Sequence, residues 1–110
     1  MINNENRQRK VVYKITYPNG KIYIGQDITD DINYFGSPDK KLLEIDYPPT
    51  NRVKFTVTKE VLWDIIEEKG YSEIVNQKET EFILKLQSNN PKIGYNKKPK
   101  YIELGYGVVE

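Results

Sequence analysis

Strand-forming residues separated by a turn sequence predict a hairpin near the start of the chain. Residues 11–17 read Val-Val-Tyr-Lys-Ile-Thr-Tyr, and residues 21–25 read Lys-Ile-Tyr-Ile-Gly. Both segments are rich in β-branched and aromatic side chains, which is typical of strands. Pro18-Asn19-Gly20 lies between them and favours a turn, because proline fixes φ while asparagine and glycine tolerate positive φ. We expect two antiparallel strands joined by a three-residue loop.

After the hairpin, the pattern predicts a short helix and a third strand. Residues 27–33 are acidic and polar, which is typical of a loop or a short helix. Residues 39–45 are expected to form a helix that ends before Pro48. Residues 53–63 contain strand formers in alternation, with these large apolar side chains on one face: Phe55, Val57, Val61 and Trp63.

Turn and cap residues delimit a longer helix in the C-terminal half. Ser72 follows Gly70 and is a good N-cap for a helix that extends to about Gln87, before Pro91. The order of two strands, a helix, a strand and a helix predicts an α+β fold. It would consist of a small three-stranded antiparallel central sheet flanked by helices.

The length of 110 residues allows one domain. We expect a flexible leader over residues 1–10, a folded domain over 11–97 and a C-terminal tail over 98–110. No apolar run approaches the roughly 20 residues that cross a bilayer, and the N-terminus lacks the apolar stretch of a signal peptide. We therefore expect a cytoplasmic protein without a membrane partner.

Cysteine and histidine are both absent. Their absence excludes disulfides, thiolate zinc sites, cysteine nucleophiles and serine triads of the usual kind. Any enzyme with this composition must use carboxylates, lysines, arginines, tyrosines or a hard metal ion bound through oxygen.

Net charge is +1, but positive charge is concentrated near the C-terminus. Residues 92–100 contain four lysines and no acid, interleaved with Tyr95 and followed by Tyr101. Such a segment is suited to tracking a phosphate backbone. A solvated basic tail is the alternative interpretation.

The hairpin register predicts a polar face. A three-residue loop would give these pairs: Tyr17 with Lys21, Ile15 with Tyr23, and Tyr13 with Gly25. Because side chains alternate, three phenols, an ammonium and a glycine would face outward together: Tyr13, Tyr17, Tyr23, Lys21 and Gly25. The opposite, core side carries Val12, Ile22 and Ile24. The alternative is aromatic pairing that only stiffens the hairpin.

Glu79 falls within an apolar stripe of the longer predicted helix. Val75, Phe82 and Leu86 recur at helical spacing, and Glu79 lies four residues after the first and three before the second. A carboxylate facing a core is costly unless it is paired or binds a metal ion. An ion pair, or a helix face that is not buried, would also explain it.

Val11-Val12-Tyr13, followed after nine residues by Tyr23-Ile24-Gly25, resembles the paired sequences of the GIY-YIG nuclease family, with Val-Val in place of the first Gly-Ile. Further similar segments follow in the family's order: Tyr34-Phe35-Gly36-Ser37, Phe55 to Leu62, Glu79, Ser88-Asn89-Asn90-Pro91 and Gly94-Tyr95-Asn96. The resemblance spans roughly residues 11–96.

This resemblance implies a GIY-YIG-like fold and an endonuclease that hydrolyses DNA with Mg²⁺ or Mn²⁺. Glu79 would hold the ion, which would act as a Lewis acid on the scissile phosphate. Tyr13 would take a proton from the attacking water, with Lys21 or the metal-bound hydration shell lowering the pKa of its phenol. Tyr23 would form a hydrogen bond with the phosphate or the water.

The resemblance implies further roles. Gly25 would leave room for the DNA backbone, and Asn96 would orient groups at the site or brace the closing loop. The lysines expected to contact DNA are Lys40, Lys41, Lys97 and Lys98.

The family's helix arginine has no counterpart between residues 25 and 49. Arg52 is the candidate to replace it, and Tyr34 is the candidate for the aromatic residue that accompanies it. Lysine lacks the planar two-pronged contact of a guanidinium. An active endonuclease is therefore one hypothesis, and a catalytically impaired nucleic-acid-binding module is the second. A small interaction protein is the third, and both a monomer and a homodimer remain open.

Overall fold

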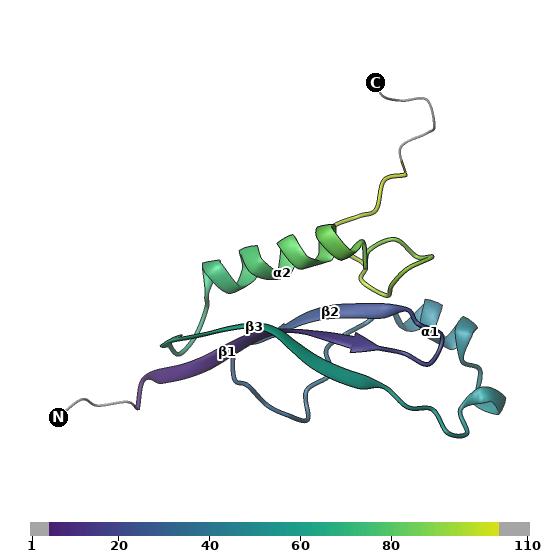
Figure 1. Cartoon of the computed structure of the whole chain (residues 1–110), viewed down its shortest axis with the longest axis horizontal. Coiled ribbons are helices and arrows are strands. Elements are labelled where there is room, and N and C mark those ends of the chain that lie inside the picture. Colours follow the sequence, from purple (N-terminus) through teal and green to yellow (C-terminus); the bar gives the residue numbers. More distant parts are fainter. Residues whose placement is uncertain (1–4, 104–110) are drawn as a thin grey trace.

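Three antiparallel strands in the order β2-β1-β3, together with two helices, form a small α+β domain (Figure 1). The structure, a computed structural model, describes residues 5–103. Its elements are β1 (Arg7–Thr16), β2 (Ile22–Asp27), α1 (Lys40–Asp46), a 3₁₀ turn (Pro49–Asn51), β3 (Thr58–Glu68) and α2 (Glu73–Leu86). Neither helix combines the length and the apolar character needed to cross a bilayer. The three-stranded sheet and the α+β class predicted from the sequence are confirmed.

The hairpin register is also confirmed. Tyr13 lies opposite Gly25, Ile15 lies opposite Tyr23, and the Tyr17 amide donates to the Lys21 carbonyl at 2.9 Å. The turn is closed by the Gly20 amide, which donates to the Tyr17 carbonyl at 2.8 Å. Gly20 has a φ of +87°, a conformation that a side chain disfavours.

The prediction of a flexible leader over residues 1–10 is wrong from residue 7 onward. β1 begins at Arg7, and the Lys10 side chain is fully buried. Its ammonium donates to Glu67 Oε1 at 3.0 Å and to the carbonyls of Glu68 and Gly70. These bonds satisfy the buried charge and fix the turn between β3 and α2.

The third strand lies five residues later than predicted. Residues 53–57 are irregular, and the strand covers Thr58–Glu68 instead of 53–63, because β1 extends back to Arg7 and supplies partners as far as Glu68. A β-bulge at Leu62 also breaks the expected parity, since Val12 pairs with Trp63 whereas Tyr13 pairs with Val61. Trp63 therefore packs on the opposite face from Val57.

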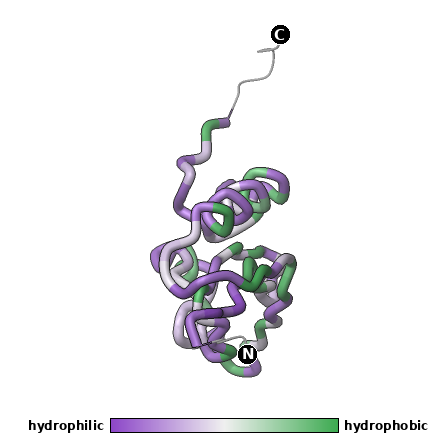
Figure 2. Tube along the Cα trace, turned by 90° about the vertical axis from the view of Figure 1, so that its left-hand side faces the viewer, coloured by the Kyte–Doolittle hydropathy of each residue, from purple (hydrophilic) through white to green (hydrophobic). Residues whose placement is uncertain are grey.

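Helix α2 covers one face of the sheet, and the two form separate layers in the view of Figure 2. The core between them contains Val12, Ile24, Val75 and Ile83. The predicted helix is confirmed: Ser72 caps it by accepting from the Val75 amide at 3.2 Å, and a left-handed Gln87 follows its last residue.

The other face of the sheet is a second core, which corrects the expectation of an outward-facing polar surface. Tyr13, Tyr17 and Tyr23 are 0–8% exposed. Leu42, Leu43 and Tyr47, in and just after α1, pack against this tyrosine cluster together with Tyr95. Alternation along the strands identified the shared face but not the segments that cover it.

The segment 93–96 pairs with the outer edge of β2. Ile22 donates to the Ile93 carbonyl at 3.1 Å and accepts from the Tyr95 amide at 2.9 Å. The Asn96 side chain continues this pairing: its Oδ1 accepts from the Ile24 amide and its Nδ2 donates to the Ile24 carbonyl, both at 2.8 Å. Residues 98–103 continue without regular structure, and the rest of the predicted tail, 104–110, lies outside the described residues.

We predict that Asn96→Ala lowers the free energy of unfolding by about 2 kcal/mol or more, because it leaves two buried backbone groups of Ile24 unpaired. Urea denaturation of the wild type and the variant measures the difference. The matched control is Asn33→Ala at an exposed position, which should change stability by less than about 0.5 kcal/mol. Equal effects in the two variants would contradict the bracing role of Asn96.

Candidate functional site

A cleft of about 360 Å³ forms where the edge of β2, helix α2, the segment before α1 and the C-terminal segment meet. Its lining combines a phenol, a carboxylate, a hydroxyl, an amide and two ammonium groups with one apolar side chain: Tyr23, Glu79, Ser37, Asn96, Lys97, Lys98 and Ile83. Glu79 and Tyr23, which are 56 residues apart in sequence, therefore line the same space. This cleft is the candidate site.

The Glu79 carboxylate is partly buried and is held by β2. Its Oε1 accepts a hydrogen bond from Gln26 Nε2 at 2.9 Å, and the same amide donates to Asn76 Oδ1 at 2.6 Å. Burial raises the pKa of Glu79, and the Gln26 bond opposes that increase only in part. Within residues 5–103 Glu79 forms no ion pair, so the ion-pair interpretation of its position is wrong.

The Tyr23 hydroxyl lies between Glu79 and the segment before α1. It accepts a hydrogen bond from the Ser37 amide at 3.0 Å, which leaves its own proton available to donate to a group in the cleft. Burial raises the pKa of Tyr23, and the negative charge of Glu79 raises it further, against the effect of the Ser37 bond. Tyr23 therefore remains a neutral donor at neutral pH.

Tyr13 lies next to Tyr23, with ring centroids 6.4 Å apart, and its buried hydroxyl has no hydrogen-bond partner within residues 5–103. Two glycines make room for it: a Cβ at Gly25 or at Gly36 would collide with the Tyr13 hydroxyl and the Tyr23 ring. Gly36 also has a φ of +79°. Burying a hydroxyl without a hydrogen-bond partner costs stability.

The pKa of Tyr13 is strongly raised, chiefly by burial and further by the charges of Tyr23, Tyr34, Asp27 and Glu79. This overturns the expectation that Lys21 lowers it. Lys21 Nζ instead pairs with Asp46 Oδ2 at 2.9 Å. That carboxylate also accepts from the Tyr95 hydroxyl, so Lys21 belongs to a network that anchors the hairpin turn to the end of α1.

The other predicted residues separate into two groups. Lys97 and Lys98 are exposed and line the cleft, and Asn96 joins them while bracing β2. Arg52 and Lys40 line a different cavity, and Arg52 Nε donates to the Tyr47 carbonyl at 2.8 Å. Lys41 is exposed on α1 and does not line the cleft.

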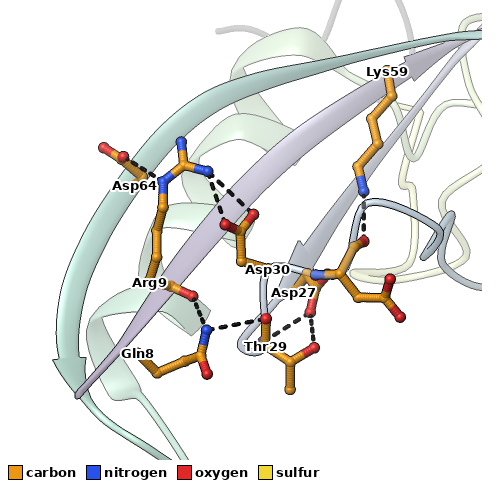
Figure 3. Close-up of polar contacts among 8 residues, drawn as sticks. Gln8, Arg9, Asp27, Thr29, Asp30, Lys59 and Asp64 are labelled. Atoms are coloured by element: carbon orange, nitrogen blue, oxygen red, sulfur yellow. Dashed lines mark hydrogen bonds and ion pairs between the residues drawn. The ribbon is translucent and has the colours of Figure 1, made fainter. Parts of the chain in front are cut away.

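Lys59 is a cation that the sequence analysis missed. Its Nζ lies 4.5 Å from the centroid of the Tyr13 ring and donates to the Tyr34 carbonyl at 2.7 Å. It also donates to the Asp31 carbonyl at 3.3 Å (Figure 3). Lys59 therefore holds the loop after β2 against the tyrosine cluster. In the sequence, Lys59 resembles any solvent-exposed lysine of a strand, so its contact with the tyrosine cluster could not be predicted.

The loop after β2 is also fixed by its own hydrogen bonds, as Figure 3 shows. The buried Asp27 carboxylate accepts from Thr29 and from the Asp31 amide. Burial alone would raise the pKa of Asp27, but these bonds outweigh it and lower the pKa. Arg9 joins Asp30 to Asp64 of β3 through contacts of 3.1 and 2.9 Å. These contacts fix the start of the segment that leads to Gly36, which lies against Tyr13.

The donor set of the cleft fits a hard divalent cation of the kind implied by the resemblance. Among the described residues there is no group of three or more His, Cys, Asp or Glu side chains that could hold a metal ion. Mg²⁺, however, usually keeps several waters and binds one or two protein carboxylates together with substrate phosphates. The Glu79 carboxylate is partly desolvated and has no ion-pair partner in the described part of the chain, and it meets that requirement.

Comparison with known proteins adds no relative. No protein-family model matches the chain, and no match is found among curated proteins or among solved structures.

Proposed function

We propose that this protein is a Mg²⁺-dependent endonuclease with a GIY-YIG-like fold that hydrolyses phosphodiester bonds of DNA in the cleft between Glu79 and Tyr23. The observation that supports it is the convergence of the partly desolvated Glu79 carboxylate, the Tyr23 phenol and two lysines on one space, with the buried Tyr13 ring directly behind Tyr23. Lys97 and Lys98 provide positive charge for a phosphate, and Glu79 provides an anionic ligand for a metal ion.

In this mechanism Glu79 holds the ion, which supplies Lewis acidity at the phosphate when bound. The Tyr23 proton is available to donate to a phosphate oxygen or to the attacking water. Because its pKa is raised, Tyr13 acts as a neutral phenol and not as a preformed phenolate. Its oxygen accepts the proton of the attacking water while its own proton passes to a phosphate oxygen, so that no isolated charge forms on the ring.

A second candidate function is a nucleic-acid-binding module without turnover. It is favoured by the position of Arg52, which lines another cavity and is fixed to the Tyr47 carbonyl. The cations of the cleft are therefore lysines, which cannot reproduce the bidentate contact of a guanidinium with a phosphate. Binding of DNA without cleavage would support this candidate.

The first prediction for this site is that the protein nicks supercoiled plasmid with Mg²⁺, that EDTA abolishes nicking, and that Glu79→Gln lowers the rate by roughly a hundredfold or more. Loss of the metal ligand removes a stabilisation of several kcal/mol from the transition state. The matched control is Glu81→Gln, on the exposed side of the same helix, which should retain the wild-type rate. Nicking that persists in EDTA and in Glu79→Gln would overturn the proposal.

Substitution of Tyr13 separates catalysis from packing. We predict that Tyr13→Phe lowers the nicking rate by roughly 10²- to 10⁴-fold and leaves Tm unchanged or higher, because it removes a buried hydroxyl without a partner. Tyr17→Phe is the control: Tyr17 is buried in the same cluster and burial raises its pKa to about 12, but its ring packs on Phe55 and Tyr95, whereas Tyr13 packs on Tyr23 of the cleft. A Tm loss of many degrees in Tyr13→Phe would favour a packing role.

The raised pKa of Glu79 predicts a pH dependence. Its folded-state pKa lies above the ordinary value of 4.5, so protonation competes with metal binding at a higher pH than for an exposed glutamate. Without metal, the folded state binds the extra proton, and stability falls as pH rises from about 4.5 through the folded pKa. Carbon NMR of the glutamate carboxyls, with and without Mg²⁺, measures both effects. A Glu79 pKa at or below 4.5 would contradict the burial argument.

A further inference from the structure

An apolar cavity of about 440 Å³ lies between α1 and the segment that leads to β3. Its floor is aromatic: the Tyr47 and Phe55 rings meet edge to face with centroids 4.7 Å apart, and Leu43 completes the wall. Phe55 remains 40% exposed. The volume lies in the range of small-molecule sites, and the rings offer a surface on which a flat group can stack.

A hydrogen bond and a ring contact hold the aromatic residues of the cavity in place. The Tyr47 hydroxyl accepts from the Asn19 amide at 2.8 Å, which ties the cavity to the hairpin turn. The Tyr17 ring lies 6.1 Å from the Phe55 ring and supports it from the tyrosine cluster. Arg52 lines the cavity and is held by its Nε, which donates to the Tyr47 carbonyl.

Three charged side chains lie around this apolar floor. Lys40 and Arg52 contribute positive charge, and Glu44 contributes one carboxylate. Two cations beside aromatic rings complement a nucleotide, which has an anionic phosphate and a flat base. A carboxylate among them can accept a hydrogen bond from the exocyclic amino group of cytosine.

We propose that this cavity binds an unstacked nucleobase of the DNA strand that enters the cleft. The inference rests on the proposed function and adds a substrate class to it: DNA with an extrahelical or single-stranded nucleotide. The base would stack on Phe55, and Lys40 and Arg52 would contact the flanking phosphates.

The cavity lies near enough to the cleft for one strand to reach both. Ser37 lines the cleft and Lys40 lines the cavity. Only two residues lie between them in the chain, so their Cα atoms are at most about 11 Å apart. That span equals about three base steps at 3.4 Å per step along a strand.

The test measures equilibrium binding in EDTA, which prevents cleavage, to three fluorescein-labelled duplexes: one with a single bulged cytosine, one with an abasic bulge and one fully paired. We expect the bulged cytosine to bind roughly tenfold tighter than the other two, and Phe55→Leu to remove that preference. Leucine keeps apolar volume but lacks a flat ring, and the Tm of the variant checks its folding. Lys40→Gln should reduce the slope of log affinity against log salt by about one.

Tyr71→Ala is the matched control, because Tyr71 is 76% exposed and lies outside the cavity; it should leave all affinities unchanged. Equal affinity for the cytosine and abasic bulges would overturn the inference, as would an unchanged preference in Phe55→Leu. If plasmid nicking then still depended on Glu79, the proposed function would stand without the base site. A cavity that serves a protein partner would leave all three DNA affinities equal.

Discussion

Pairing along the outer edge of β2 is the constraint on which the cleft depends. An edge strand leaves backbone groups to be satisfied by something other than the sheet. Here the segment 93–96 meets Ile22 through its backbone and Ile24 through the Asn96 amide. Gly94 permits this approach, because a Cβ there would collide with the carbonyls of Ser88 and Ile22. The same contact brings the lysines after Asn96 beside Glu79, so sheet stability and site assembly share one set of hydrogen bonds.

The burial of Glu79 works against the stability of the folded protein at neutral pH, where an exposed glutamate would be ionised. Burial raises the pKa values of Glu79, Tyr13 and Tyr23, and the neighbouring negative charges raise those of both phenols further. Other buried ionisable groups, such as Lys10 and Asp27, have several hydrogen bonds each. Buried polar groups that hold turns therefore form several hydrogen bonds each, whereas Glu79 and Tyr23 at the cleft form fewer. Perturbed groups gathered in a cleft are typical of functional sites.

Features determined by neighbouring residues were predictable from the sequence. The hairpin register followed from its turn, and the start of α2 followed from Ser72. Features that depend on distant contacts were not. The extension of β1 to Arg7 shifted β3, and α1 covered the phenols that were expected to face outward. The placement of Glu79 in the same cleft as Tyr23 could be predicted only from the family resemblance. Helical spacing identifies a carboxylate on an apolar helix face, but it does not identify the residues that this carboxylate faces. Lys59 carried no local signal at all.

The positive groups flank the segment that begins α1. Lys97 and Lys98 lie on the cleft side, whereas Lys40 and Arg52 lie at the aromatic cavity. The family's arginine would place one guanidinium at the phosphate; in this chain the charge is distributed over several side chains. Distributed lysines stabilise a bound strand through Coulomb attraction but give weak directional control at one phosphate. In the proposed endonuclease, such an arrangement would place more of the orienting role on Tyr23 and on Glu79 as the metal ligand. Gln26 would then act as a positioning residue, because its amide donates to the Glu79 carboxylate.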